Sequence, residues 1–185
     1  MPKSKTQGAL ADPTKLKPFK KKNGLLKVVV ETPKGSRNKY AFDPDEEIFK
    51  LKRVLPAGMT FPYDFGFVPQ TEADDGDPVD VLVLMDDAVF PGCLIVCRLV
   101  GVLECEKEDP QGKKVRNDRL IAVEQGEQQL YAKVNDIRDL PEALLQQIGH
   151  FFVSYHQLRG NRFHILGPKG PDVARRLLEK QRVAA

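Results

Sequence analysis

Three carboxylates within six residues give the sequence its clearest chemical signal: Asp75, Asp77 and Asp80. Carboxylates held together repel one another, and hard divalent cations, which prefer oxygen ligands, can offset that repulsion, as can solvent. Gly76 permits an unusual backbone turn, and Pro78 stiffens the loop between the second and third acids. The segment predicts a site that holds carboxylates for a metal ion, with an acidic, solvated turn as the plainer alternative.

The spacing around Gly76 excludes a calcium loop of the EF-hand type. With this glycine at position six of such a loop, position one would be Thr71 and position twelve would be Leu82. Neither side chain supplies the carboxylate that those positions need. A different kind of oxygen site is therefore indicated.

The elements that must position these acids are mainly strands. Apolar alternation and β-branched residues predict six strands, and residues 56–70, rich in Pro, Gly and aromatic residues, predict an irregular loop. The predicted strands are residues 25–31, 39–43, 48–55, 79–85, 92–106 and 119–124. Because strands come first and helices last, the order favours an α+β fold, mainly β: an antiparallel barrel or sheet with one or two helices packed outside.

Two helices are predicted near the C-terminus. The segment Asp139-Leu140-Pro141-Glu142 resembles a capping box with Pro in the first turn, apolar residues follow at helical spacing, and Gly160 is the expected stop. A short terminal helix is expected within residues 172–182. Both helices lie far along the chain from the acidic segment.

The net charge of +3 conceals an uneven distribution. Residues 1–22 hold seven Lys and one Asp (+6), whereas the other 163 residues hold 22 bases and 25 acids (−3). We interpret residues 1–22 as a Lys-rich mobile arm and residues 23–185 as a single domain. No apolar stretch is long enough to span a membrane, and the N-terminus lacks the apolar core of a secretory signal.

The three cysteines, Cys93, Cys97 and Cys105, do not describe a disulfide framework, because their number is odd and no secretory signal precedes them. They lie in an apolar run without a nearby His, which argues against a metal site. Small buried thiols in a reducing compartment are the best interpretation, and a cytoplasmic location is expected.

The pattern D-x-D-P-x-D followed by a hydrophobic strand resembles the signature of the soluble inorganic pyrophosphatases of family I. Other segments match that family in order, from about Gly24 to Gly160. They are VVVETP with Glu31, Lys39-Tyr40, the aromatic loop FPYDFGFVP, GVLECEKED with Asp109, RLIAV, and DLPEALLQQIGHFFVSYHQL ending near Tyr155. The family resemblance implies an OB-like closed antiparallel β-barrel with helices outside.

The resemblance also implies a reaction and a set of site residues. The reaction is hydrolysis of inorganic pyrophosphate by water activated at several Mg²⁺ ions, with Mn²⁺ or Co²⁺ as possible substitutes. The implied metal ligands are Asp75, Asp80, Asp109, Glu31 and the residue at position Asn117; the implied general base is Asp77; the implied phosphate-binding residues are Lys39, Arg53, Arg119 and Tyr155. Members of the family assemble as dimers or hexamers, so a homo-oligomer is implied.

Several residues depart from the family pattern. Ala41 stands where a carboxylate is common, and Phe61 and Phe65 stand where tyrosines are usual. His156 and Arg119 each replace a lysine, and the arginine keeps the charge with a different geometry. These departures concern the phosphate and auxiliary metal positions, so a divergent pyrophosphatase is implied.

The most consequential departure is Asn117, which stands where the family has a metal-binding aspartate. Asp118 lies next to it, and the turn before it is longer than usual, so a shifted register could bring Asp118 inward. Because neighbouring side chains of a regular strand face opposite ways, only one of the two can contact the metals without a bulge. The sequence leaves that choice open.

Three other functions remain as alternatives. A degenerate homologue could bind divalent ions or a partner without turnover, as Asn117 and Ala41 would suggest. An OB-like domain could bind single-stranded nucleic acid through the basic arm, although the net acidic body opposes this. A related enzyme could hydrolyse another phosphoanhydride, such as a short polyphosphate.

Overall fold

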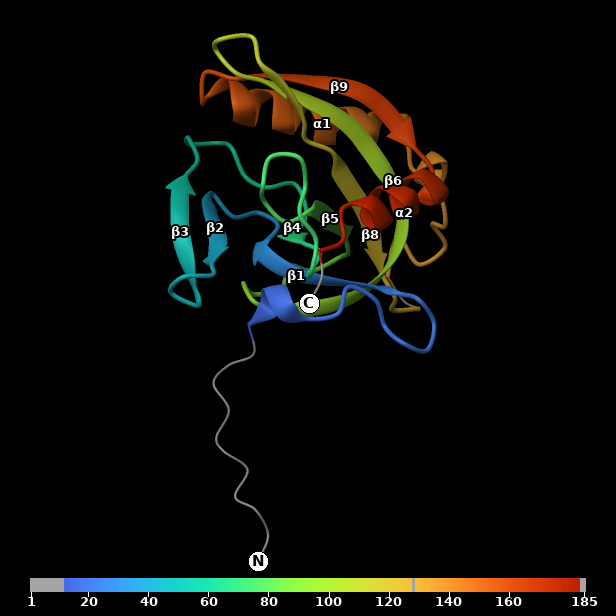
Figure 1. The fold of residues 1–185 in the computed structure, drawn as a ribbon. Coiled ribbons are helices and arrows are strands. Elements are labelled where there is room, and N and C mark those ends of the chain that lie inside the picture. Colours follow the sequence, from blue (N-terminus) through green and yellow to red (C-terminus); the bar gives the residue numbers. More distant parts are fainter. Residues whose placement is uncertain (1–11, 128, 184–185) are drawn as a thin grey trace, which may run out of the picture.

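The structure is a computed structural model that describes residues 12–127 and 129–183 (Figure 1). Within these residues it contains nine strands, two α-helices and two short 3-10 helices. The strands are β1 (Leu26–Thr32), β2 (Asn38–Asp43), β3 (Ile48–Val54), β4 (Asp64–Phe67), β5 (Asp80–Leu84), β6 (Leu94–Glu108), β7 (Lys114–Arg116), β8 (Arg119–Glu124) and β9 (Arg162–Lys169). The helices are the 3-10 helices Pro13–Lys15 and Ile137–Asp139, α1 (Glu142–Gln157) and α2 (Pro171–Lys180).

A closed ring of strands forms the body and confirms the predicted barrel. The order is β1-β4-β5-β8-β6, and β6 pairs back with β1 to close the ring. Its pairs are antiparallel except β5 with β8, which run parallel. The strands β7 and β9 extend the sheet from β6, and β2 pairs with β3 in a separate hairpin beside the ring (Figure 1). The helices α1 and α2 lie outside the strands, as expected.

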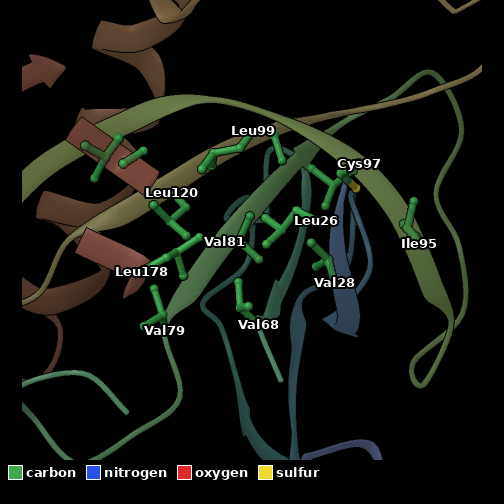
Figure 2. Close-up of a cluster of buried hydrophobic side chains, with 14 of the residues drawn as sticks. Leu26, Val28, Val68, Val79, Val81, Ile95, Cys97, Leu99, Leu120 and Leu178 are labelled. Atoms are coloured by element: carbon green, nitrogen blue, oxygen red, sulfur yellow. The ribbon is translucent and has the colours of Figure 1, made fainter. Parts of the chain in front are cut away.

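Apolar alternation builds two cores on opposite faces of the strands. Along β5, Val81 and Val83 belong to one cluster, whereas Leu82 and Leu84 belong to the other. The first cluster, shown in Figure 2, joins strand residues to Leu178 of α2. The second packs against α1 through Phe152 and its neighbours. Since side chains alternate along a strand, an apolar run buried on both faces is the expected signature of such a position.

Three strands were not predicted from the sequence. The strand β4 lies within residues 56–70, where a loop was expected, β7 lies between the predicted strands 92–106 and 119–124, and β9 follows the first predicted helix. In β4, Gly66 pairs with Val30 so closely that an added Cβ would lie 2.0 Å from the Val29 carbonyl oxygen. In β9, Gly167 and Pro168 are tolerated because this edge strand pairs with β6 alone. Tertiary pairing thus overrides local turn signals.

The predicted capping box of α1 is wrong. At the other end of the helix, the expected stop at Gly160 is confirmed: its φ is +74°, its N–H donates to the Gln157 carbonyl at 3.0 Å, and the Asn161 N–H donates to the His156 carbonyl at 3.1 Å. At the start, Pro141 precedes the helix and makes no side-chain cap. Asp139 instead closes a capping box with Asp136 around the preceding 3-10 helix. The extended backbone of Leu140 separates the two helices, so the acid caps the shorter one.

The structure describes only residues 12–22 of the N-terminal segment that was expected to be a mobile arm. Residues 1–11 lie outside the described residues. In residues 12–22, Asp12 caps the 3-10 helix through Thr14, and Phe19 forms an isolated bridge with Leu26 of β1. The Pro18 carbonyl accepts a hydrogen bond from the Lys27 N–H at 2.7 Å. This described part therefore lies against the barrel.

The cysteines are free, and Cys97 and Cys105 are buried. Burial raises the pKa of both thiols, to about 12 in the case of Cys105. They are therefore packing residues, as the sequence suggests. Among the described residues, no helix is both long and apolar enough to span a membrane.

Candidate functional site

A cavity of about 680 Å³ lies where the hairpin β2–β3, the loop before β5, the strands β6 and β8 and the end of α1 converge. Nine of the ten residues singled out from the sequence line it. They are Glu31, Lys39, Arg53, Asp75, Asp77, Asp80, Asn117, Arg119 and Tyr155. Residues more than 120 positions apart in the chain therefore meet at one place.

The loop before β5 brings its three acids to the cavity through local turn chemistry. Gly76 adopts a φ of +85°, as its position in the motif suggested, and its N–H donates to the Ala73 carbonyl at 2.9 Å. The Ala73 N–H in turn donates to the Asp77 carbonyl at 2.7 Å. Asp77 is exposed, and within the described residues its carboxylate has no hydrogen-bond or ion-pair partner. It is thus free to contact a bound molecule.

Asp80, at the start of β5, is already paired with a cation. Its Oδ2 lies 2.7 Å from the Arg119 guanidinium at the start of β8. Burial raises the pKa of Asp80 to about 6, although the positive charges of Arg119 and Lys39 oppose the rise. The parallel pairing of β5 with β8 sets this contact, because Val81 is in register with Leu120. An ion pair therefore joins two sides of the cavity.

Glu31, at the end of β1, holds the hairpin against the barrel. One carboxylate oxygen accepts the Phe42 N–H at 2.9 Å, and the other lies 3.4 Å from Lys39 Nζ. The same ammonium lies 4.2 Å from the centroid of Phe65, a cation–π contact. The phenylalanine that replaces the family's tyrosine thus packs against the lysine and offers it no hydroxyl.

The structure brings Asn117, not Asp118, into the cavity. The Asn117 side chain is 5% exposed and donates from Nδ2 to Asp75 Oδ2 at 2.5 Å. Asp118 faces the other way, where its Oδ1 accepts the Cys105 N–H at 2.8 Å and pairs with Arg116. Neighbouring side chains of a strand face opposite ways, and here the neutral amide of Asn117 faces the cavity while the carboxylate of Asp118 faces away.

Asp109 does not line the cavity. It follows the last residue of β6, and its carboxylate accepts hydrogen bonds from the Gln111 N–H at 2.9 Å and the Lys113 N–H at 2.8 Å. These contacts close the β6–β7 turn, which is ordinary Asp turn chemistry. Lys107, two residues earlier, lines the cavity in its place.

The end of α1 contributes two rings to the cavity, those of Tyr155 and His156. Tyr155 is 8% exposed, and the Arg53 guanidinium lies 5.8 Å from its ring centroid. His156 stacks on Phe163 with centroids 4.3 Å apart, and burial, together with the nearby cations, lowers its pKa to about 3. It is therefore neutral. This histidine lines the cavity as well.

Sequence reasoning did not find Lys107 or Arg159 among the cavity residues. Alternation from Cys105, a buried residue of β6, would have turned Lys107 inward. Spacing of four residues from Tyr155 would have suggested Arg159. Both signals are weak by themselves, because a lysine on a strand and an arginine after a helix are usually solvated.

The donor set suits a hard divalent cation in kind, because six carboxylates line the cavity: Asp43 and Asp45 of the hairpin, and Glu31, Asp75, Asp77 and Asp80. Among the described residues, however, no three acids, histidines or cysteines are grouped closely enough to hold an ion together. Asp75 is engaged by Asn117 and Asp80 by Arg119. Arg119 pairs with Oδ2 of Asp80, and among the described residues Oδ1 has no hydrogen-bond or ion-pair partner.

Comparisons with known proteins agree on one family. The family model described as inorganic pyrophosphatase matches residues 28–184. The chain is 41% identical over 163 residues to the inorganic pyrophosphatase of Synechocystis sp., covering 88% of this chain and 93% of that protein. It is 39% identical over 150 residues to the inorganic pyrophosphatase of Saccharolobus solfataricus, covering 80% and 84%. The crystal structure of inorganic pyrophosphatase from Thermus thermophilus matches with a TM-score of 0.81 and 35% identity, covering 91% of this chain and 95% of that one.

Proposed function

The chain belongs to the inorganic pyrophosphatase family and hydrolyses inorganic pyrophosphate with divalent metal, and we propose that the metal is Mg²⁺, held by Asp75 and Asp80. Its closed ring of strands is the OB-like barrel of that family. One observation carries the proposal: the carboxylates of the loop before β5 share a cavity with Lys39, Arg53 and Arg119. Hard oxygen ligands beside phosphate-binding cations suit a magnesium-dependent phosphoryl reaction.

Bound divalent ions supply charge neutralisation of the anion and a more acidic water. Glu31 is suited to serve an additional ion, since it lies at the cavity rim within reach of the hairpin. Mn²⁺ and Co²⁺ are expected to substitute, because the same oxygen set accepts them.

Asp77 is the proposed general base or water-orienting group. Its carboxylate is exposed within the cavity and is not engaged by another described residue. A positioned carboxylate that accepts a proton from the attacking water contributes typically 10²–10⁴-fold in rate. Of the loop's three acids, it is the one whose oxygens remain available.

Lys39, Arg53, Arg119 and Tyr155 are the proposed phosphate-binding residues. Arg suits multi-donor recognition of phosphate oxygens, and Lys acts as a compact charge. Arg119 is positioned by Asn117, whose backbone carbonyl accepts a hydrogen bond from the guanidinium at 3.1 Å. Arg119 also lies 2.7 Å from Asp80, so a phosphate bound by this arginine would lie beside a carboxylate that would hold the metal.

The decisive experiment is phosphate release from magnesium pyrophosphate by the purified full-length chain. We expect Asp77→Asn to lower the rate by about 10²–10⁴-fold. The matched control is Asp74→Asn, an exposed acid of the same loop that does not line the cavity, and its rate should stay within twofold, roughly the scatter of surface changes. Release by the wild type no faster than by Asp77→Asn with Mg²⁺, Mn²⁺ or Co²⁺ would contradict the proposal.

We also propose a cytoplasmic homo-oligomer. Free cysteines, two of them buried, support a reducing compartment. Ile165 of β9 is exposed and lines an apolar groove with Leu145 and Val153 of α1, which supports a contact between copies. Sedimentation velocity at several protein concentrations tests the assembly, and a single monomeric species would contradict it.

A further inference from the structure

The cavity wall formed by β6, β8 and the end of α1 has the opposite character to the acidic loop. We call it the basic wall: Lys107, Asn117, Arg119 and Arg159, with His156 between them. It supplies three cations and no carboxylate to the cavity. The sequence had led us to expect two metal ligands here, Asp109 and the residue at position 117.

Strand alternation directs Lys107 into the cavity and its acidic neighbours away from it. Leu103 and Cys105, on the same side of β6, are buried in the second core. Glu106 and Glu108 lie on the opposite face of β6. Glu106 pairs with Lys114 at 3.0 Å, and Glu108 pairs with His164 at 2.9 Å. The nearest acids are therefore engaged elsewhere, and within the described residues Lys107 has no ion-pair partner.

His156 marks the point on which these cations converge. It is 3% exposed, and neither ring nitrogen has a hydrogen-bond partner among the described residues. Burial lowers its pKa most, and four nearby cations lower it further: Arg119, Arg159, Lys107 and Arg53. A buried polar group without a partner costs about 1–3 kcal/mol. A ligand that accepts a hydrogen bond would remove that cost, and the surrounding charges select an anion.

We propose that Lys107, with Arg159 and His156, forms a phosphate subsite that binds its anion through side-chain charge in the absence of metal. Lys107 is then a further substrate-binding residue beyond those expected from the sequence. The inference rests on the proposed function for its substrate, since the bound group is one phosphate of pyrophosphate. It differs from the acidic loop, where bound phosphate would require metal to offset the carboxylates.

The test is calorimetric titration of inorganic phosphate into the full-length chain in buffer containing EDTA. We expect measurable binding by the wild type, at least tenfold weaker binding by Lys107→Gln, and no detectable binding by Lys107→Asp. The matched control is Lys113→Gln, an exposed lysine of the β6–β7 turn outside the cavity, which should bind as the wild type does. Circular dichroism and the melting temperature verify that each variant is folded.

A second measurement separates substrate binding from a structural role. For hydrolysis of magnesium pyrophosphate, Lys107→Gln should raise KM about tenfold with a smaller change in kcat, and Lys107→Arg should restore most of the loss. Wild-type hydrolysis without phosphate binding in EDTA would overturn the inference and leave the proposed function intact. Phosphate binding in EDTA without hydrolysis under any metal would support the inference and contradict the proposed function. Equal phosphate affinity of wild type and Lys107→Gln would also overturn the inference.

Discussion

The acidic loop and the basic wall face each other across one cavity but are built differently. The loop takes its three acids from six consecutive residues and fixes them by turns such as that at Gly76. The basic wall draws on two strands and a helix end, and the pairing of β6 with β8 sets its geometry. Local chemistry is therefore sufficient to make the metal side, whereas the anion side exists only in the folded barrel.

The two sides meet at the ion pair of Asp80 with Arg119, and breaking it should have the largest effect on stability. Arg119 is 4% exposed, and its guanidinium lies 4.9 Å from the Phe152 centroid as well as 2.7 Å from Asp80. Arg119→Met leaves the partly buried Asp80 carboxylate without its partner, so we expect a loss of about 3 kcal/mol in the free energy of unfolding. Urea denaturation measures this loss.

The double variant Asp80→Asn with Arg119→Met is the control for that interpretation. Removing both charges should recover at least about 1 kcal/mol relative to Arg119→Met, because no unpaired charge remains. If the single variant lost less than about 1 kcal/mol, the pair would be no stronger than a surface contact. The link between loop and wall would then be unsupported.

The neutral histidine of the basic wall predicts a pH dependence of stability. The pKa of His156 is lowered from 6.5 to about 3 in the folded chain. Between these two pH values, the imidazole is protonated in the unfolded chain but stays neutral in the folded chain. Stability should fall from pH 6.5 toward pH 3, by about 2 kcal/mol between pH 7 and pH 5. His156→Phe keeps a ring against Phe163 and should remove this part of the dependence.

The exposed His150 of the same helix offers the control. His150→Phe should leave the pH dependence of unfolding as it is in the wild type. Chemical denaturation at pH 5, 6 and 7 compares the three proteins. Parallel curves for wild type and His156→Phe would show that the basic wall does not hold a neutral imidazole.

Asn117→Asp tests whether the wall can be made to resemble the loop. The new carboxylate would lie next to Asp75, so we expect Mn²⁺ to bind about tenfold more tightly, on the order of 1.4 kcal/mol, with a lower melting temperature without metal. Asp118→Asn, which changes the side chain facing Cys105, should leave Mn²⁺ affinity unchanged. Equal affinities of Asn117→Asp and wild type in calorimetry would contradict the arrangement.

The contrast between loop and wall also explains what the sequence could predict. The motif at Asp75, the strand of β5 and the helix α1 carry local signals: turn residues, alternation and helical spacing. The strands β4 and β9 contain glycines and prolines that suggest loops, and only their pairing partners make them strands. Local reasoning therefore recovered the acids and four of the five ring strands but not β4 or β9, and the closure of the ring was implied only by the family resemblance.

The same limit of local signals explains why Asp109, and not Lys107, was expected in the cavity. Residues 107 and 109 would both face the cavity if the alternation of β6 continued. Because β6 ends at Glu108, Asp109 lies in the turn instead. A bulge between Glu104 and Cys105 in the pairing with β9 also shifts the register. The strand end has a turn signal in Pro110 and Gly112, whereas the bulge has no signal in the residues themselves.

The smallest predicted effect follows from that distinction. Asp109→Asn keeps an acceptor for the Gln111 and Lys113 N–H groups and removes only charge, so we expect a stability loss of about 0.5 kcal/mol. The dependence of hydrolysis on Mg²⁺ should remain within twofold of the wild type, roughly the scatter of a surface change. Steady-state rates across a Mg²⁺ series measure it. A tenfold shift would mean that Asp109 reaches the cavity during turnover and that the basic wall acquires a metal ligand the strand pairing does not provide.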